Sequence, residues 1–355
     1  MKKILVIQFQ QVGDVLISSE LCVAIKKSYP EYVVDYLVAS FTRDVVDGHP
    51  AINEVIALDK SKGFLHYLSV IRYVRKKKYD IVLDALCKPR TGLIALLSGA
   101  SNTISFNFKG RGLFYKKLIP LISEGKRHTI DMRMDLVRAA GLEIESSQHA
   151  KIHLSEDEKS KFKPILEDRG IKETDFKIIF GVNSRRVYKE WPKDNFLKVI
   201  SHCIEKYDAK IIFFHTDKER DECVRLQQES EYTSSIYLDW PIESIRNMAC
   251  LFYQCDFMIG NDSGPRHMAQ CLGVPTLSIF SPDISKWSWN PHDDERYVAV
   301  DIQDALGLND EEIIDKLSDV NKENAQEYMN LISPEFVIKK ADEMIASLEL
   351  RNHTL

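Results

Sequence analysis

Short apolar runs alternate with amphipathic stretches along the first 120 residues. Each run has the length of a buried strand, and the stretches between them carry apolar residues at helical spacing. The expected strands are KKILVIQF, VVDYLVA, EVIALD and YDIVLDAL, and the expected helices are VLISSELCVAIKKSY and FLHYLSVIRYVRKKK. This alternation predicts right-handed βαβ units and a mainly parallel sheet, hence an α/β fold.

The same alternation begins again after a polar stretch near residues 145–170. The second set of strands comprises FKIIFGVN, AKIIFFH, SIYLD, CDFMIG and PTLSIF, with helices such as NFLKVISHCIEKY between them. The pattern therefore predicts two α/β lobes, residues 1–160 and 161–330, with a cleft between the carboxyl ends of their strands. Residues 331–355 contain an amphipathic helix, which we expect to return to the first lobe.

Composition places the chain among ordinary soluble globular proteins. Its 355 residues suffice for two domains, and 44% of them are hydrophobic and 28% charged. No apolar run approaches the roughly 20 residues of a membrane span, and MKKILVIQFQ reads as a first strand rather than a signal peptide. The seven cysteines form no CxxC pair, which favours reduced thiols in a cytoplasm over disulfides or a zinc site.

Charge is distributed unevenly along the chain. Residues 1–160 carry 24 Lys and Arg against 18 Asp and Glu, whereas the remainder carries 24 against 35. The basic first half indicates an anionic partner for that lobe. Nucleic acid is not that partner, because the overall pI is about 6.1 and no nucleic-acid-binding motif is present.

The most informative stretch is GNDSGPRHMAQCLGVP, residues 260–275. It follows an apolar strand, and Pro265 occupies the start of a helix that we expect to end near Gly273. A helix N-terminus behind a corner of small residues favours an anion such as a phosphate. The alternative is an ordinary strand-to-helix connection in which Ser263 or Asp262 caps the helix. His267, in the first helical turn, could face the anion or pack inward.

Three further loops carry candidate chemistry. Asp14 follows the first strand and could act as a general base, although capping the next helix is the simpler interpretation. The loop has one glycine rather than GxGxxG, so it does not indicate a dinucleotide site. Lys189 could neutralise a phosphate or simply be solvent-exposed. Glu219 could accept hydrogen bonds from a ribose or complement a helix dipole.

A basic cluster with interleaved aromatic residues occupies positions 106–127. A mobile loop of this composition could grip an anionic acceptor or rest on an anionic membrane surface, although solubility explains any single charge. The cluster contains Phe106, Phe108, Lys109, Arg111, Phe114, Tyr115, Lys116, Lys117, Lys126 and Arg127.

Four segments, in order, resemble glycosyltransferase family nine, the lipopolysaccharide heptosyltransferases. They are KILVIQFQQVGDVLISSELCVAIKKSYP, RHTIDMRMDLVRAAGL, SRRVYKEWPKDNF and GNDSGPRHMAQCLGVPTLSIFSP. The resemblance implies a GT-B architecture of two Rossmann-like lobes, with the acceptor in the first and the nucleotide-sugar in the second. Bulky Gln10 and Gln11 before the Gly-Asp pair, and Ser263 in place of a common Thr, depart from the family pattern.

The resemblance also implies roles for individual residues. Asp14 and Lys189 match the catalytic residues, the first as the base that deprotonates the acceptor and the second at the donor diphosphate. The implied donor site consists of Ser184, Lys189, Glu219, Asp262, Ser263, Gly264 and His267. For the acceptor we expect Gly13, Lys109, Arg111, Lys116 and Lys117.

The implied reaction is inverting and needs no metal or other cofactor. It moves a heptose from ADP-L-glycero-D-manno-heptose to the Kdo/heptose inner core of lipopolysaccharide in a Gram-negative bacterium. The expected location is the cytoplasm, in peripheral contact with the anionic inner membrane. The alternatives are another nucleotide-sugar or acceptor, a nucleotide-sugar epimerase of the same architecture, and a silent binding protein.

Overall fold

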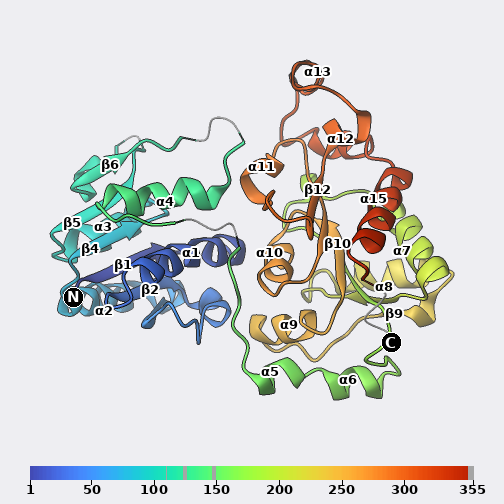
Figure 1. Cartoon of the computed structure of the whole chain (residues 1–355), viewed down its shortest axis with the longest axis horizontal. Helices are drawn as coiled ribbons and strands as arrows, with labels where there is room; N and C mark the ends of the chain where they lie inside the picture. Colours follow the sequence, from blue (N-terminus) through green and yellow to red (C-terminus); the bar gives the residue numbers. More distant parts are fainter. Residues whose placement is uncertain (109, 123–125, 146–148, 351–355) are drawn as a thin grey trace. The chain divides into compact units, whose positions relative to one another are not determined.

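The computed structural model describes residues 1–108, 110–122, 126–145 and 149–350, and it forms two compact units, Met1–His153 and Leu154–Leu355 (Figure 1). The boundary falls slightly earlier than the expected 160/161. The segment after it belongs to the second unit, because α5 (Glu156–Ser160) contacts α9 (Ile245–Phe252) and Glu158 accepts two hydrogen bonds from Arg246.

The first unit is built on a six-stranded, wholly parallel sheet in the order β3-β2-β1-β4-β5-β6. Its strands are β1 (Lys3–Gln8), β2 (Val33–Ala39), β3 (Glu54–Leu58), β4 (Ile81–Asp84), β5 (Asn102–Phe106) and β6 (Lys117–Ile119). Its helices are α1 (Val12–Ser28), η1 (Ser40–Val45), η2 (Lys60–Lys62), α2 (Gly63–Lys77), α3 (Pro89–Leu97), η3 (Gly112–Phe114) and α4 (Thr129–Ala139).

Helix pairs cover this sheet. Helices α1 and α4 contact one another, and so do α2 and α3. The second pair shares a core with side chains of β1 and β4. Strand β1 is therefore buried along almost its whole length, and it reads as a continuous apolar run, as central strands of parallel sheets do. In the register of the sheet, Leu5 pairs with Asp35 on one side and Val82 on the other.

The second unit repeats this design with the order β12-β11-β10-β7-β8-β9, again all parallel. Its strands are β7 (Lys177–Gly181), β8 (Lys210–Phe213), β9 (Ile236–Tyr237), β10 (Phe257–Asn261), β11 (Thr276–Ile279) and β12 (Tyr297–Val300). Its helices, besides α5 and α9, are α6 (Lys163–Asp168), η4 (Val187–Lys189), α7 (Lys193–Tyr207), α8 (Arg220–Glu229), η5 (Thr233–Ser235), α10 (Gly264–Cys271), α11 (Lys286–Trp289), α12 (Ile302–Leu306), α13 (Asp310–Lys316), α14 (Ala325–Met329) and α15 (Pro334–Ser347).

Both sheets therefore have the strand order of a Rossmann fold. In this order, successive strands are added first on one side of the first strand and then on its other side. The reversal lies between β1 and β4 in the first unit and between β7 and β10 in the second. At such a point the two connecting segments leave in opposite directions and open a crevice at the carboxyl ends of the strands. Loops after β1, β4, β7 and β10 are therefore the places where a site is expected.

The C-terminal helix belongs to the core of the second unit. α15 packs on α7, and Val337, Ala341 and Met344 join that core. Asp342 reinforces this contact by accepting hydrogen bonds from three residues of α7. The amphipathic pattern of the sequence showed which face of this helix is buried but not that α7 covers it.

Two further expectations concerned the cysteines and membrane-spanning helices. None of the seven cysteines, all of which lie within the described residues, forms a disulfide, and all are buried. Among residues 1–108, 110–122, 126–145 and 149–350, no helix is long and apolar enough to cross a membrane.

Candidate functional site

The corner between β10 and α10 has the predicted form. Ser263 occupies the N-cap position of α10, and Pro265 lies in its first turn, as the sequence predicted. The Ser263 side chain makes no capping hydrogen bond, and its hydroxyl is buried without a hydrogen-bond partner among the described residues. The first N–H groups of a helix have no partner within the helix, so the start of α10 presents donors beside a serine hydroxyl.

Asp262 joins this corner to the loop after β7. Its Oδ2 lies 2.8 Å from Lys189 Nζ, and its Oδ1 lies 2.8 Å from a guanidinium nitrogen of Arg266. Burial raises the pKa of Asp262, but the charges of Arg266 and Lys189 outweigh this and hold it well below its usual range. The carboxylate is therefore ionised and bridges two cations, which leaves the cluster with a net positive charge.

Arg266 is held rigidly beneath the corner. Its side chain is 1% exposed, and its guanidinium also donates to Gln270 Oε1 and to the carbonyl of Trp289 and lies over the Phe280 ring. Gln270 in turn donates to Thr276 and Asn290 at 2.9 Å. This network fixes Arg266 from several sides, so Asp262 has a defined position from which to orient Lys189.

His267 packs inward, which resolves the two alternatives that the sequence left open. Its Nε2 lies 2.8 Å from Arg266, and its ring meets Trp289 edge-on at 6.0 Å between centroids. Because a guanidinium only donates, Nε2 must accept this hydrogen bond and the ring proton resides on Nδ1. His267 therefore supports the corner through Arg266.

The loop after β7 is tied to β10 by side-chain hydrogen bonds. Asn261 Oδ1 accepts from the Trp191 backbone N–H at 2.8 Å, and Asn261 Nδ2 donates to the carbonyl of Val182 at 2.9 Å. Trp191 is fully buried, and its indole N–H donates to Ile332. The backbone N–H of Ser184, a predicted donor residue, donates to Glu190 Oε1 at 2.7 Å. These contacts position Lys189 at the reversal point of the second sheet.

Glu219 lies at the carboxyl edge of the same sheet, directly before α8. Its Oε2 accepts hydrogen bonds from the Thr216 backbone N–H and hydroxyl at 2.8 and 2.7 Å. The contact is exposed and local. One oxygen of Glu219 therefore stabilises its own turn. The other predicted donor residues Lys189, Asp262, Ser263 and Gly264 lie together in one corner.

In the first unit, Asp14 does not cap α1. The N-cap is Gln11, and Asp14 lies in the first turn of the helix, so the simpler interpretation of this residue was wrong. Asp14 Oδ1 lies 2.5 Å from Arg133 of α4, which also donates to the Asp14 carbonyl at 2.9 Å and to the Ser18 hydroxyl at 2.7 Å. The carboxylate is thus fixed at the carboxyl edge of β1, with its side chain 17% exposed.

The predicted acceptor residues do not form one group. Gly13 precedes Asp14 in the first turn of α1, and Arg111 donates to the carbonyl of Cys87, beyond the carboxyl end of β4. Lys116 and Lys117 instead lie at the amino ends of β5 and β6, the opposite edge of the sheet from Asp14. Lys109 lies outside the described residues.

Lys116 and Lys117 of the basic cluster have backbone partners within the first unit. Lys116 Nζ donates to the carbonyls of Ala100 and Ser101, and Lys117 Nζ donates to Ala139 at the end of α4. Lys116 therefore holds the segment before β5, and Lys117 the last residue of α4. Tyr115 is buried and donates to Asp84 at 2.6 Å, which makes it a core residue rather than part of a mobile loop.

The residues that sequence reasoning missed are the partners of the predicted ones. Arg133 lies among the buried Ile130, Met134 and Val137, and an arginine at apolar spacing on a helix is a signal that could have found it. Arg266 stands four residues after Asp262, a spacing that allows an ion pair within one helical turn. Asn261 gave no signal, because its partners are distant in sequence.

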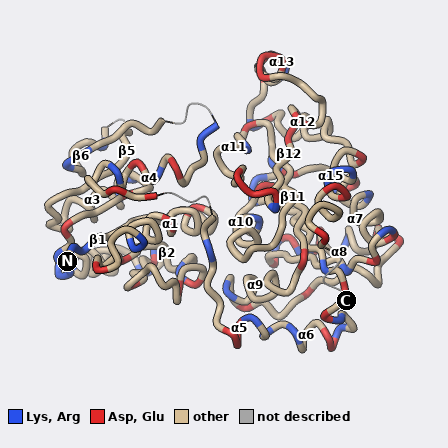
Figure 2. The backbone as a smooth tube through the Cα atoms, viewed as in Figure 1, with Lys and Arg blue, Asp and Glu red and all other residues tan. Residues whose placement is uncertain are grey.

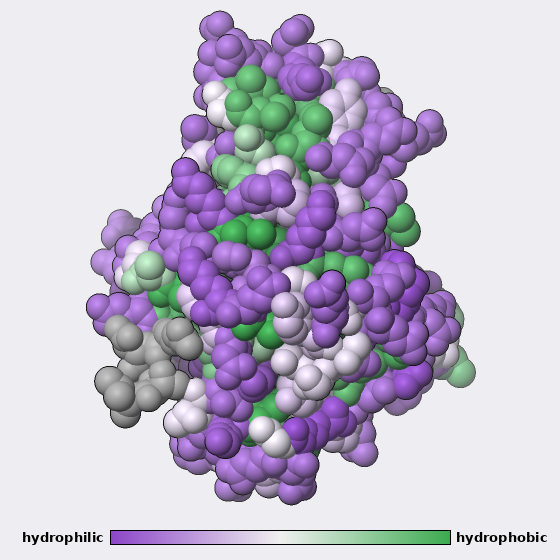
Figure 3. All heavy atoms as spheres, turned by 90° about the vertical axis from the view of Figure 1, so that its right-hand side faces the viewer, coloured by the Kyte–Doolittle hydropathy of each residue, from purple (hydrophilic) through white to green (hydrophobic). Residues whose placement is uncertain are grey.

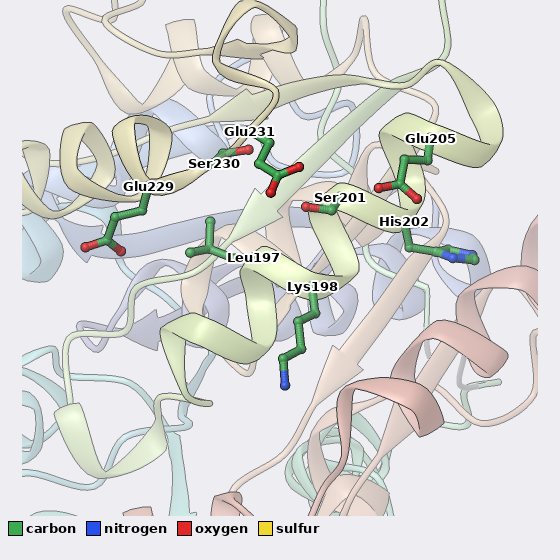
Figure 4. A pocket seen from close by; sticks show the side chains of 8 residues that line it. All are labelled: Leu197, Lys198, Ser201, His202, Glu205, Glu229, Ser230 and Glu231. Carbon is green, nitrogen blue, oxygen red and sulfur yellow. The ribbon is translucent and has the colours of Figure 1, made fainter.

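Possible metal-ligand groups and cavities were compared with these corners. Within the described part of the chain, no three His, Cys, Asp or Glu residues are arranged to hold a metal ion. A hollow of about 360 Å³ lies between α7 and the end of α8, where Ser201 and Glu231 point toward one another (Figure 4). Its lining contains no predicted site residue.

Comparison with known proteins identifies the family. The model of glycosyltransferase family 9 (heptosyltransferase) matches residues 67–304. Lipopolysaccharide heptosyltransferase 3 of Escherichia coli K12 is 22% identical over 275 residues, which are 76% of this chain and 79% of that protein.

Solved structures share the fold across nearly the whole chain. A glycosyl transferase family 9 protein from Veillonella parvula has a TM-score of 0.82 at 23% identity and covers 98% of this chain and 97% of its own. Escherichia coli heptosyltransferase WaaC with ADP-2-deoxy-2-fluoro heptose has a TM-score of 0.70 at 14% identity, with coverages of 96% and 99%. The expected GT-B fold class is confirmed, and the chain belongs to glycosyltransferase family 9, the heptosyltransferases.

Proposed function

We propose that this glycosyltransferase moves a heptose from ADP-L-glycero-D-manno-heptose to the Kdo/heptose inner core of a lipopolysaccharide precursor, with inversion and without a metal. The observation that carries the proposal is the corner in which Asp262 orients Lys189 beside the N-terminus of α10. A cation and helix N–H groups together suit a diphosphate. The names of the relatives support heptose as the sugar and lipopolysaccharide as the acceptor.

In the proposed reaction an acceptor hydroxyl oxygen attacks the anomeric carbon of the donor sugar. The bond between that carbon and the β-phosphate oxygen breaks on the opposite face, so the configuration inverts and ADP leaves. Negative charge grows on the departing phosphate, and Lys189 with the N–H groups of Ser263 and Gly264 would stabilise it. Because these groups supply positive charge, the proposal assigns no step to a metal.

Asp14 would accept the proton of the attacking hydroxyl. A general base needs a fixed carboxylate with an accessible oxygen. Arg133 meets the first need, since it binds Oδ1 of the carboxylate and the carbonyl of Asp14, and Oδ2 lies outside these two hydrogen bonds. Arg133 is accordingly a positioning residue, and Glu219 is proposed at the donor ribose through its second oxygen.

The proposed acceptor is an anionic, lipid-linked saccharide. The excess of basic over acidic residues in the first 160 positions supports this partner, and the predicted acceptor residues Gly13 and Arg111 lie at the carboxyl edge. The protein would act in the cytoplasm, in peripheral contact with the anionic inner face of the inner membrane.

An incubation with and without acceptor tests the proposal. The purified chain is supplied with ADP-heptose, with and without a Kdo-bearing lipid A acceptor, and each mixture is run with and without EDTA. ADP release and product mass are measured. We expect ADP release only with the acceptor, a product heavier by one heptose, and no effect of EDTA. Conversion of the free nucleotide-sugar without acceptor would indicate an epimerase, and turnover only with another nucleotide-sugar would reject heptose.

Two variants separate donor binding, measured by calorimetry, from the transfer reaction. Asp14→Ala should abolish transfer while ADP binding by calorimetry stays nearly unchanged, because no donor contact is assigned to Asp14. Lys189→Met should weaken both transfer and ADP binding. Equal loss of ADP binding in both variants would contradict the assigned roles.

A further inference from the structure

We propose that three adjacent loop tips of the first unit form a docking surface for an anionic lipid bilayer. This surface, here called the rim, consists of Phe64, Leu65 and Leu113 together with Lys60, Lys62, Lys88 and Arg90. It differs from the basic cluster that the sequence suggested. The inference rests on the proposed function in one respect, namely that the acceptor is anchored in that bilayer.

The apolar part of the rim is unusually exposed. Phe64 and Leu65, in the first turn of α2, are 68% and 80% exposed, and Leu113 of η3 is 89% exposed. Core packing does not account for these side chains, since more than two-thirds of each is exposed. Large apolar residues gathered at one surface are a common mark of protein or membrane contact.

Contacts between the three loops make the rim continuous. The hydroxyl of Tyr67 in α2 donates to the carbonyl of Arg90 at the start of α3, at 2.7 Å. Within α3, Gly92 packs so closely on the Phe114 ring that an added Cβ would lie 2.7 Å from it. The α3 start thus links the tip that carries Phe64 and Leu65 to the tip that carries Leu113.

The charge of the rim selects the partner. Lys60 and Lys62 precede Phe64, and Lys88 and Arg90 flank Pro89 at the start of α3; all four are exposed. Residues 60–65 and 88–90 contain no acidic residue, and Asp59 is the neighbouring carboxylate, 4.0 Å from Lys62. Apolar side chains among cations match a bilayer of anionic lipids, into which they insert while the cations meet the headgroups.

A second exposed apolar patch provides a comparison. Leu306 of α12 and Ile314 of α13 are 40% and 72% exposed. Figure 3 shows apolar side chains near the top of its face, at the height of these helices. Acidic residues follow α13 in Figure 2, where Asp310, Glu311 and Glu312 form its first turn. An anionic bilayer would repel this patch, so it serves as a control.

The location of the rim fits the reaction. The loops that form it follow β3, β4 and β5, so they lie at the carboxyl edge of the sheet, the edge at which Asp14 follows β1. Docking through the rim would bring this edge to the lipid surface. A sugar carried on a lipid anchor would then be presented near Asp14 at a high effective concentration.

Vesicle co-sedimentation tests the rim. The full chain is mixed with vesicles of phosphatidylcholine alone or with added phosphatidylglycerol, and the bound fraction is measured at low and high salt. We expect binding to the anionic vesicles, weakened by salt, and little binding to the neutral ones. Equal binding to both vesicle types, or to neither, would overturn the proposal.

Matched variants assign any binding to the rim. Phe64→Ser/Leu65→Ser/Leu113→Ser should lower the partition coefficient at least tenfold, and replacing the four cations by Gln should lower it about fivefold per charge. Leu306→Ser/Ile314→Ser should leave it unchanged. Because the replaced side chains are exposed, thermal midpoints should stay close to that of the parent. Parent-like vesicle binding by the apolar rim variant would reject the inference.

Transfer assays distinguish failure of the rim from failure of the proposed function. Rim variants should glycosylate a deacylated, water-soluble acceptor at the parent rate and a vesicle-embedded acceptor more slowly. If the parent glycosylates neither acceptor, the proposed function is rejected. The vesicle measurements then still test whether the rim binds an anionic bilayer. Equal slowing on both acceptors would show that the rim acts on catalysis and not on docking.

Discussion

Lys189 and Asp262, which are 73 residues apart in the chain, form a 2.8 Å ion pair beside β7 and β10, where the strand order of the second sheet reverses. The other oxygen of the same carboxylate binds Arg266. One carboxylate therefore holds two cations, of which Arg266 is buried beneath the corner and Lys189 is 13% exposed. Asp262 is best understood as the residue that aims Lys189, because a carboxylate by itself would repel a diphosphate.

Replacing the carboxylate and replacing Lys189 should have different effects. Asp262→Asn leaves Arg266 buried without its counter-charge, so we expect the free energy of unfolding to fall by about 3 kcal/mol. Lys189→Met should change stability by less than about 1 kcal/mol but lower kcat by roughly 10²-fold or more. Urea unfolding and steady-state transfer rates measure the two effects.

A surface ion pair serves as the control for that comparison. Arg225 is exposed and binds Glu222 and Glu229 on its own helix, so Arg225→Met should cost less than about 1 kcal/mol and leave transfer unchanged. A stability loss in Asp262→Asn no greater than in Arg225→Met would contradict the structural role of the buried pair.

Arg133 should act on catalysis through Asp14. Arg133→Lys cannot bind the Asp14 carboxylate, its carbonyl and Ser18 together, so we expect kcat to fall about 10- to 100-fold with little change in KM for the donor. Arg138→Lys, on the exposed face of the same helix, should behave like the parent. A rise in donor KM without loss of kcat would show that Arg133 belongs to donor binding.

Glu20 predicts a pH dependence of folding stability. Burial raises the pKa of this carboxyl to about 8, against the opposing charge of Lys151. Because the folded-state pKa exceeds the unfolded one of about 4.5, its contribution is fully present below pH 4.5 and is lost as the pH rises toward 8. The loss is at most about 5 kcal/mol.

Replacing Glu20 reveals this contribution. Glu20→Gln stays neutral, so the variant should gain stability relative to the parent between pH 5 and 8, with the gain largest at pH 8. Chemical unfolding at several pH values measures it, and Glu31→Gln at an exposed position is the control. Parallel pH profiles for parent and Glu20→Gln would disprove the prediction.

Two glycines beside the corner should differ in tolerance. Gly260 and Gly181 pair across β10 and β7, and a Cβ on Gly260 would lie 2.7 Å from the backbone of Gly181. Gly260→Ala must push the two strands apart, so we expect a loss of about 2 kcal/mol or more and reduced ADP binding.

Gly181→Ala is the matched control. Its Cβ would meet the end of the Met258 side chain at 2.9 Å, and a flexible methionine can move aside. We expect a loss below about 1 kcal/mol in thermal or urea unfolding. Equal losses in the two variants would mean that backbone crowding does not control this position.

Much of the fold was predictable because its signals are local. Strands β1, β2, β7 and β10 follow apolar runs, and the start of α10 follows from Ser263 and Pro265. The pattern of apolar and polar residues did not predict α3, β5, β6 and β12 as elements of their own. Strand β6, for example, spans only Lys117–Ile119 and carries a lysine, so its pairing with β5 is what makes it a strand.

The sequence by itself determined two parallel α/β units and the polar corners at the ends of their strands, because hydrophobic period and helix-start residues act within a few positions. Only the tertiary structure decided which charges meet. Asp14 and Arg133 are 119 residues apart, Lys116 and Lys117 fall at the edge opposite Asp14, and α15 finds its partner in α7. Such contacts depend on how strands are ordered and faces covered, and no local pattern carries that information.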